Sequence, residues 1–161
     1  MIHIPAYYQS LDLIPNLELM RLLKEEINWI QRKQLLIATL GHSPYKFSGV
    51  TYPAQPIPEF LQPLLNSLVE VSEIPFNTIH CNYYKDGSVG LGRHQDNEPE
   101  HTHDDIVSIS LGETRHFIVN NQTISLADGD LVHFNRYEYH SVPKQPKVTG
   151  ERISLTFRVF K

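Results

Sequence analysis

The second half of this chain consists of short runs of β-branched and aromatic residues separated by residues that favour turns. The separating sequences include Asp-Gly, Leu-Gly, Asp-Gly-Asp and several prolines. Closely spaced runs of this kind predict many short strands, as in a β-sandwich, a jelly roll or a barrel. We therefore expect strands over residues 78–84, 106–111, 116–120, 131–134 and 152–160.

Two segments of the first half carry the apolar spacing of amphipathic helices. The first covers residues 16–30, with Asn16 as a candidate N-cap and apolar residues at steps of four and three, namely Leu19, Leu23, Ile27 and Ile30. In the second, Pro58 suits a first helical turn and the same spacing links Leu61, Leu64, Leu65 and Leu68. The expected fold is mainly β with flanking helices (α+β), the helices covering one outer face of a sheet.

The length and composition indicate one soluble domain. A chain of 161 residues can bury one core, and we expect residues 1–76 to form a helical buttress and residues 77–161 to form the β core. No apolar run approaches the roughly 18 residues of a membrane span, and no secretory signal is visible. Cys81 is the only cysteine, which excludes an internal disulfide and fits a reducing compartment. A cytoplasmic location, or a nuclear one in a eukaryote, is therefore expected rather than secretion.

The charge of the chain limits its contact with nucleic acid. A formal net charge of −4 argues against a long basic face that would bind the phosphates of a duplex. Any phosphate contact must therefore be small and local. The candidate basic residues, each of which is also compatible with an ordinary solvated charge, are Arg32, Lys33, Lys46, Lys85, Arg93, Lys144 and Lys147.

Two histidines and an aspartate form a candidate metal site. His94 and Asp96 are two residues apart, so their side chains point the same way in an extended segment. His140 follows an apolar run and would join them from another strand. Two imidazoles and one carboxylate can occupy one face of Fe(II) and leave the opposite positions open for a co-substrate and O₂, as in the facial triad of non-haem oxygenases.

Other ligand sets remain open, because the chain has nine histidines and zinc accepts the same donors. His133 lies in an alternating strand, where a hydrogen-bonded role is expected. Residues 101 and 103 lie in the acidic, loop-like stretch 98–105. The histidines that could supply competing pairs are His101, His103, His116 and His133.

Two arginines near the end of the chain form a candidate anion site. Arg152 and Arg158 are six residues apart, so on a strand they share one face with Ser154 and Thr156. Guanidinium groups suit bidentate carboxylate binding, and a buried pair requires anionic partners. A dicarboxylate chelated to the metal would supply them. The alternative is two surface arginines on an edge strand.

Several ordered motifs resemble those of AlkB-type 2-oxoglutarate dioxygenases. They are Asn-Tyr-Tyr-Lys-Asp-Gly at 82–87, His-Gln-Asp-Asn-Glu at 94–98, Ile-Val-Ser-Ile-Ser-Leu-Gly at 106–112 and Arg-Ile-Ser-Leu-Thr-Phe-Arg at 152–158. The resemblance extends upstream to Arg-Lys-Gln at 32–34 and Tyr-Lys-Phe-Ser-Gly at 45–49, so it covers most of the chain. Several motifs in one order are far more specific than any single motif.

The resemblance implies a double-stranded β-helix (jelly roll, cupin-like) with a defined set of ligands. Fe(II) would be bound by His94, Asp96 and His140. With O₂ as the other co-substrate, 2-oxoglutarate would be held by Asn82, Tyr84, Arg152, Ser154 and Arg158.

The same resemblance implies a set of substrate-binding residues, namely Arg32, Phe47, Ser48 and Glu98. Phe47 would stack on a base flipped out of its strand, with His94 close to the other face, and Glu98 would line the pocket. Flipping is required on a duplex because a methyl group on the pairing edge cannot reach a metal while the base is stacked. For Phe47, an ordinary core aromatic is the alternative.

Two departures from the family pattern bear on the substrate. Ser154 stands where relatives often carry asparagine, and Asn97 where double-strand repair members tend to carry a second acid. We also expect no aromatic wedge before Arg32, because residues 23–30 are predicted to be helical. Single-stranded DNA or RNA is therefore expected rather than intact duplex, with the protein as a monomer.

The reaction implied is the oxidative demethylation of N-alkylated bases such as 1-methyladenine and 3-methylcytosine, with release of succinate, CO₂ and formaldehyde. Two alternatives use the same residues differently. One is a 2-oxoglutarate-dependent hydroxylase of a protein or small molecule. The other is a nucleic-acid binding module without turnover, although such a module has no need for paired inward arginines beside a metal triad.

Overall fold

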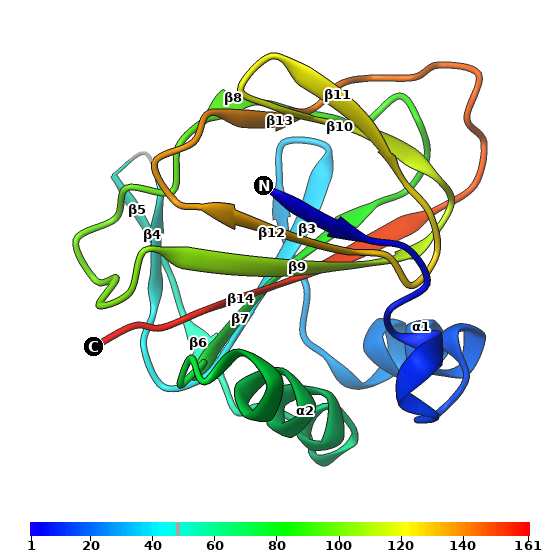
Figure 1. Ribbon diagram of the computed structural model, residues 1–161. Helices are drawn as coiled ribbons and strands as arrows, with labels where there is room; N and C mark the ends of the chain where they lie inside the picture. Colours follow the sequence, from blue (N-terminus) through cyan, green and yellow to red (C-terminus); the bar gives the residue numbers. More distant parts are fainter. Residues whose placement is uncertain (48) are drawn as a thin grey trace.

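Two β-sheets face each other, and two helices cover the outer face of the larger sheet, in the computed structural model, which describes residues 1–47 and 49–161 (Figure 1). The large sheet contains, in spatial order, β1 (Ile2–Ile4), β12 (Leu131–Asn135), β9 (Asp105–Gly112), β14 (Arg152–Arg158), β7 (Thr78–Tyr84), β3 (Leu35–Leu40) and β2 (Ile30–Arg32). Its remaining strand, β6 (Ala54–Gln55), pairs in parallel with β3.

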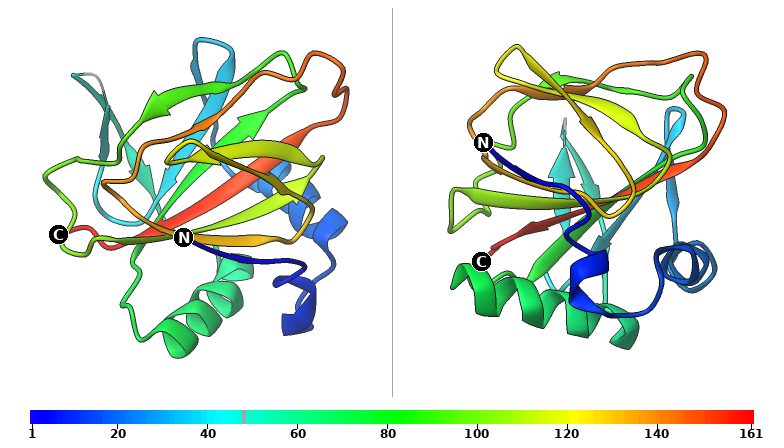
Figure 2. Two further views of the ribbon diagram at one scale, coloured as in Figure 1. Left: turned by 45° about the horizontal axis from the view of Figure 1, so that its top comes forward. Right: turned by 45° about the vertical axis from the view of Figure 1, so that its right-hand side comes forward.

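The small sheet lies over the inner face of the large one (Figure 2). Its strands, in spatial order, are β11 (Gln122–Leu126), β10 (Arg115–Val119), β13 (His140–Val142) and β8 (Leu91–His94). A separate hairpin joins β4 (Tyr45–Phe47) to β5 (Val50–Tyr52).

Strand alternation divides the interior into two hydrophobic cores. On β14, Ile153, Leu155 and Phe157 belong to the core that also contains the helices. The second core lies between the two sheets and includes Tyr84, Phe117, Phe134 and Val142. The inner face of β14 carries polar residues instead, so the space between the sheets is apolar in part and polar in part. The polar part of this space contains the candidate site.

The helices are α1 (Asn16–Glu26) and α2 (Gln62–Ser72), with short 3-10 helices η1 (Gln9–Leu11) and η2 (Glu59–Leu61). Leu19 and Leu23 of α1 and Leu64 and Leu68 of α2 are buried against the outer face of the large sheet. The two helices thus lie on one outer face of the large sheet. Among the described residues, no helix has the length and apolar character needed to cross a membrane.

The first helix is shorter than the sequence predicts. It ends at Glu26, because Ile27 is extended (φ −104°, ψ 143°), and Ile30 begins β2. The prediction of Asn16 as N-cap is also wrong, since Pro15 holds that position and Asn16 is the first helical residue. Ile27 and Ile30 are apolar because, as extended chain, they pack against the two hydrophobic cores, and their spacing happens to match that of a helix.

The prediction that residues 23–30 are helical, and so carry no aromatic wedge, is therefore wrong from Ile27 onward, because the segment directly before Arg32 is extended. It contains Trp29, whose ring meets Tyr83 edge to face at 5.5 Å between centroids. The indole N–H of Trp29 donates to the Leu23 carbonyl at 3.1 Å. This aromatic residue is thus held against the scaffold.

The five predicted strands are present with small shifts at their ends. The segment 116–120 is β10 at Arg115–Val119, and the segment 152–160 ends at Arg158. The division at residue 76 does not separate helices from sheet, because β1, β2, β3 and β6 of the first half extend the large sheet. β1, β2 and β6 have only two or three residues, too few for alternation to indicate them. β3 is a six-residue, mostly apolar run that the sequence analysis did not identify as a strand.

Candidate active site

The three candidate metal ligands come from one edge of the small sheet. His94 ends β8 and His140 begins β13, and these two residues are directly opposite each other in the antiparallel pair. Asp96 follows two residues after β8, where its backbone N–H donates to the Arg136 carbonyl at 2.9 Å. The sheet thus presents two imidazoles, and the turn beyond it adds a carboxylate.

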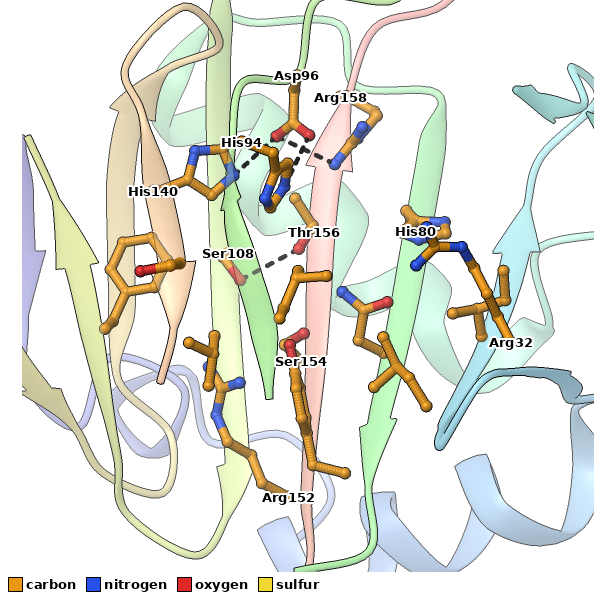
Figure 3. A pocket seen from close by; sticks show the side chains of 18 of the residues that line it. Arg32, His80, His94, Asp96, Ser108, His140, Arg152, Ser154, Thr156 and Arg158 are labelled. Atoms are coloured by element: carbon orange, nitrogen blue, oxygen red, sulfur yellow. Dashed lines mark hydrogen bonds and ion pairs between the residues drawn. The ribbon is translucent and has the colours of Figure 1, made fainter. Parts of the chain in front are cut away.

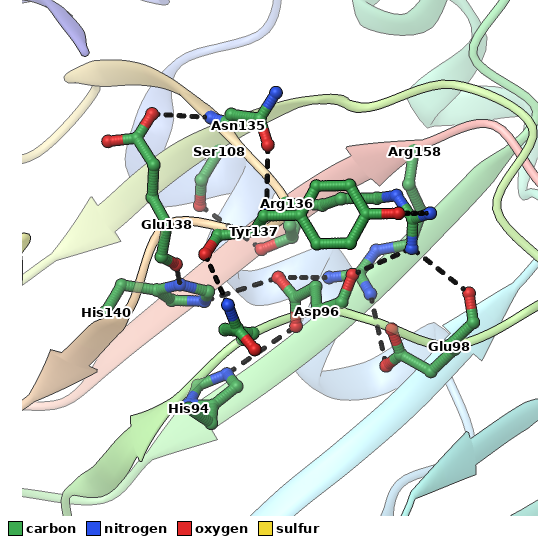
Figure 4. A network of polar contacts seen from close by, with 12 residues as sticks. His94, Asp96, Glu98, Ser108, Asn135, Arg136, Tyr137, Glu138, His140 and Arg158 are labelled. Carbon is green, nitrogen blue, oxygen red and sulfur yellow. Dashed lines mark hydrogen bonds and ion pairs between the residues drawn. The ribbon is translucent and has the colours of Figure 1, made fainter.

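The ligand atoms of His94, Asp96 and His140 all lie within 4.8 Å of one another, the one such group found among the described residues. The carboxylate faces both rings, with Asp96 Oδ1 3.6 Å from His94 Nε2 and Asp96 Oδ2 3.3 Å from His140 Nε2 (Figure 4). This convergence is what a single bound ion requires. The donor set, two neutral nitrogens and one oxygen, is that of a facial triad.

Backbone carbonyls fix the orientation of both imidazoles. His94 Nδ1 donates to the Gly92 carbonyl at 2.7 Å, and His140 Nδ1 donates to the Glu138 carbonyl at 2.9 Å. Both rings therefore turn Nε2 toward Asp96, where in the metal-free protein an Nε2–H group can donate to the carboxylate. Once Nε2 loses this proton, its lone pair is available to a metal while Nδ1 stays bonded to its carbonyl, as is expected of metal-binding histidines.

The charge of Asp96 is stabilised in place. Burial alone would raise the pKa of its carboxyl, but the Arg158 guanidinium and hydrogen bonds from His140 and His94 lower that pKa well below its usual range. Arg158 Nη2 lies 3.6 Å from Asp96 Oδ2. The carboxylate is thus ionised, as a metal ligand must be.

Residues of β14 and β7 form the floor of the cavity next to the triad. The cavity is lined from β14 by Arg152, Ser154, Thr156 and Arg158, and from β7 by His80, Asn82 and Tyr84. Figure 3 shows Arg158 at the end of the strand near Asp96 and Arg152 at the opposite end. The predicted shared face of β14 is confirmed, and β14 lies inside the sheet between β9 and β7 rather than at an edge.

Both floor arginines are buried with N–H groups that have no acceptor. Each residue is only 2% exposed, and Nε and Nη1 of both are inaccessible and make no hydrogen bond within the described part of the chain. Arg158 lies beside Asp96 and Glu98, whereas Arg152 Nη2 donates to Ser110 Oγ at 2.9 Å and no described carboxylate pairs with Arg152. Because a buried cation without a counter-charge is costly, Arg152 above all fits a bound anion.

The ligand atoms of the triad suit Fe(II), and the N–H groups of the two arginines suit the carboxylates of 2-oxoglutarate. The triad offers three ligand atoms on one side, and the cavity extends from it along β14 toward Arg152. Arg158 stands beside the metal ligands and Arg152 at the far end, so cationic groups flank both ends of the floor. A dicarboxylate is the ligand class that such a floor suits.

Tyr45 and His80 form a pair in this cavity that was not predicted from the sequence as part of the site. Their rings stack at 3.9 Å between centroids, and Thr39 Oγ1 lies 3.2 Å from His80 Nδ1. Burial, and next the charge of Arg158, lower the pKa of His80 to about 3, so the ring is neutral. A signal existed in the even spacing of His80, Asn82 and Tyr84, which places all three on one strand face.

The candidate substrate residues are only partly described. Arg32 lines the cavity. Glu98 is buried and is not among the lining residues, because His101 Nε2 lies 3.0 Å from its Oε2 and Arg158 Nη1 lies 3.8 Å from its Oε1. The side chain of Phe47 and the whole of Ser48 lie outside the described residues.

The competing histidines lie elsewhere. His133 Nε2 bonds to Asp105 Oδ1 at 2.9 Å, which matches the hydrogen-bonded role expected of it. His103 Nδ1 lies 3.6 Å from the other oxygen of Asp105, and His116 is exposed on β10.

Arg115 is a further residue that sequence reasoning missed. It is 1% exposed, and its guanidinium donates to the carbonyls of Val89, Pro143 and Asp86 and to the side chain of Gln145. These acceptors lie in the loops next to β8 and β13. Arg115 thus holds together the two strands that carry the histidine ligands.

Known proteins share both the sequence pattern and the fold. Residues 16–158 match the model of the 2OG-Fe(II) oxygenase superfamily. The chain is 32% identical to mouse DNA oxidative demethylase ALKBH2 over 148 residues, covering 80% of this chain and 62% of that protein. It is 29% identical to rat alkB homolog 3, a 2-oxoglutarate-dependent dioxygenase, over 84% of this chain and 52% of that protein. It thus spans less than two thirds of these relatives.

Solved structures confirm the jelly-roll fold. A 2OG-Fe(II) oxygenase family protein from Burkholderia pseudomallei superposes with a TM-score of 0.64 at 14% identity, over 98% of this chain and 83% of its own. A Trichoplax adhaerens prolyl hydroxylase gives 0.60 at 13% identity, over 99% and 82%. The family match and the ALKBH2 similarity confirm the AlkB-type resemblance of the motifs. The chain belongs to the 2OG-Fe(II) oxygenase superfamily.

Proposed function

We propose that this protein oxidatively removes methyl groups from the nitrogens of nucleic-acid bases of the 1-methyladenine and 3-methylcytosine type, in single-stranded DNA or RNA. The observation that carries the proposal is the His94, Asp96 and His140 triad beside buried arginines with unpaired N–H groups. The substrate class is supported by the similarity to proteins named as DNA oxidative demethylase ALKBH2.

The overall reaction balances with 2-oxoglutarate and O₂ as co-substrates. One oxygen atom of O₂ enters the new carboxylate of succinate as CO₂ leaves, and the other is inserted into a C–H bond of the N-methyl group. The N–C bond of the resulting hemiaminal then breaks, which releases formaldehyde and leaves a proton on the base nitrogen. Fe(II), bound by His94, Asp96 and His140, would supply the oxidation chemistry.

The protein side chains would bind, orient and exclude water. Arg152 and Arg158 would pair with the carboxylates of 2-oxoglutarate, with Asn82, Tyr84 and Ser154 as the remaining polar wall. The rings of Phe117 and Phe134 lie 5.9 and 4.6 Å from the His140 ring and shield its inner side from water. Such apolar shielding strengthens the charge interactions within the site.

The base would enter from the side of the cavity where Arg32 lies. Phe47 is proposed to stack on it, opposite His94, and Ser48 to lie beside it. Glu98, held by His101 and Arg158, is proposed to contribute to the wall of the base pocket. A base must leave its stack to reach the metal, and a single strand makes this step less costly.

The test is a product assay on methylated oligonucleotides, single- and double-stranded, with Fe(II), 2-oxoglutarate and O₂. Wild-type protein should form formaldehyde and succinate in equal amounts from strands with 1-methyladenine or 3-methylcytosine. His140→Ala should lose this activity, whereas His116→Ala, which changes an exposed imidazole on β10, should retain it.

Undiminished turnover by His140→Ala would contradict the metal assignment. Inertness toward every methylated strand, combined with hydroxylation of a peptide or small molecule, would replace the substrate class.

A further inference from the structure

A groove of about 600 Å³ adjoins the candidate active site. Its walls come from three segments that are distant in sequence: residues 32–35 around the turn between β2 and β3, residues 89–94, which include β8, and Lys144 after β13. The groove and the active-site cavity share Arg32, Leu35, Leu91 and His94. A ligand in the groove therefore lies next to the metal site.

The groove is strongly basic in a protein that is acidic overall. Arg32, Lys33, Arg93 and Lys144 line it, and the described residues that line it include no aspartate or glutamate. Lys33, Arg93 and Lys144 are exposed. Because the whole chain has a formal net charge of −4, these cations concentrate positive potential at one place on the surface. An anionic partner would be attracted to this groove rather than to the surface in general.

The backbone of the groove is open to close approach. A Cβ atom on Gly92 would meet no heavy atom within 4 Å, so space remains free beside this backbone. Gly90, in contrast, is pressed against β13, since a Cβ there would lie 2.7 Å from the Val142 carbonyl. The backbone at Gly90 is thus packed against β13, whereas the backbone at Gly92 is open to a ligand in the groove.

An exposed aromatic ring stands at the rim. The guanidinium carbon of Arg93 lies 3.9 Å from the centre of the Tyr139 ring, which connects this ring to the basic groove. Tyr139 is 41% exposed and immediately precedes His140. Cationic grooves beside exposed aromatic rings are the arrangement by which proteins bind single-stranded nucleic acid, with phosphates on the cations and bases on the rings.

We propose that this groove binds the phosphates next to the target nucleotide in a single strand, with Lys33, Arg93 and Lys144 as phosphate partners and Tyr139 as a stacking platform. The inference rests on the proposed function, which it makes more specific. Four cations in one groove can pair with a few consecutive phosphates, whereas a duplex would need an extended basic face. Stacking on Tyr139 further requires an unpaired base.

The experiment measures binding rather than turnover. A fluorescent, unmodified single-stranded oligonucleotide is titrated with the full chain between 50 and 200 mM salt. The test variant is Lys33→Gln/Arg93→Gln/Lys144→Gln. Each lost phosphate contact lowers the slope of log affinity against log salt by about 0.7, so the variant should lose roughly 2 from the slope. Across this fourfold rise in salt, wild type should then lose about 20-fold more affinity than the variant.

Two matched variants separate this role from general charge and from misfolding. Lys33→Arg/Arg93→Lys/Lys144→Arg keeps the charges and should restore the wild-type slope. Lys85→Gln/Lys147→Gln/Lys161→Gln removes the same charge from residues that do not line the groove and should behave as wild type. Tyr139→Leu should weaken binding with little change in slope, because it removes stacking but no cation.

An unchanged slope in the first variant, or an equal loss in the Lys85, Lys147 and Lys161 variant, would overturn the groove assignment. Displacement of the strand by a poly-glutamate peptide as effectively as by unlabelled oligonucleotide would overturn the nucleic-acid assignment. The outcome is distinct from that of the proposed function. If the salt slope falls in the Lys33, Arg93 and Lys144 variant but no methylated strand is demethylated, the groove assignment stands and the proposed function fails. If methylated strands are demethylated but the salt slope is unchanged in the variant, only the groove assignment fails.

Discussion

Arg115 and Arg152 are both buried near the Tyr84 ring, at 5.4 and 5.2 Å from its centre, but only Arg115 has acceptors for its guanidinium on several sides. Arg115 bonds to three carbonyls and one amide oxygen, whereas Nε and Nη1 of Arg152 have no partner. Burial lowers the pKa of both guanidinium groups. The contrast separates an arginine that stabilises the fold from one that binds a ligand.

We predict opposite effects of replacing these two arginines by methionine. In metal-free protein, Arg115→Met should lower the free energy of unfolding by about 2 to 4 kcal/mol, because buried carbonyls lose their donor. Arg152→Met should raise it by about 1 to 4 kcal/mol, because an unpaired buried cation is removed. Urea unfolding measures both, and equal destabilisation by the two variants would refute the ligand role of Arg152.

His80 should make the metal-free protein sensitive to mild acid. Its pKa is lowered to about 3 from 6.5, first by burial and then by Arg158, so the folded state takes up no proton at pH 5 while the unfolded state does. The stability is therefore complete above pH 6.5 and falls as the pH decreases. Between pH 7 and 5 the loss from this residue should be about 2 kcal/mol.

Unfolding curves of wild type and His80→Asn at both pH values measure this contribution. The variant lacks the titrating ring, so its loss of stability between pH 7 and 5 should be smaller by about the same amount, roughly 2 kcal/mol. If both proteins lose the same free energy, the ring is protonated in the folded state and the argument from burial fails.

At the level of elements, the end of α2 carries a residue in an unfavourable backbone conformation. Glu73 is left-handed (φ 61°, ψ 16°), and its N–H donates to the Val69 carbonyl at 2.8 Å. Glycine is the usual residue at such a helix end because it has no Cβ. Glu73→Gly should therefore raise the free energy of unfolding by about 1 kcal/mol.

The control for this prediction is Glu73→Ala, which removes the same carboxylate but keeps a Cβ. It should give no stabilisation. If alanine stabilises as much as glycine, the effect comes from the lost charge rather than from the backbone.

The sequence predicted those elements whose periodicity and packing agree. The alternation of β14 placed Arg152 and Arg158 on one face, and the spacing of His94 and Asp96 placed both beside His140, as found. The end of α1 was not predictable, because Ile27 and Ile30 continue the helical spacing although both are extended chain packed against the cores. Short-range pattern cannot distinguish these cases, since tertiary packing decides between them.

The features that were not predicted depend on contacts between residues that are distant in the sequence. Tyr45 meets His80 across a gap of more than thirty residues, and the acceptors of Arg115 come from two separate loops. No local sequence motif indicates such contacts. The division at residue 76 failed for the same reason, because the partner of β1 is β12, which follows it by over a hundred residues.

At the scale of the whole molecule, the core next to the helices and the core between the two sheets differ in composition. The core between helices and large sheet is apolar throughout, so it holds the fold without any ligand. The space between the sheets combines apolar residues with the triad and the arginines. Binding of a metal and a dicarboxylate should therefore stabilise the molecule mainly through this inner layer, by about 2.7 kcal/mol at a ligand concentration of 100 times Kd.

The central claim is that one cavity joins the metal triad to an anion site for 2-oxoglutarate. Calorimetric titration of 2-oxoglutarate, with Mn²⁺ in place of Fe(II) so that no turnover occurs, tests it most directly. Wild type should bind 2-oxoglutarate tightly only when Mn²⁺ is present, and Arg152→Met should weaken this binding about 10- to 100-fold. Binding that is equally tight without metal, or unchanged in Arg152→Met, would contradict the account.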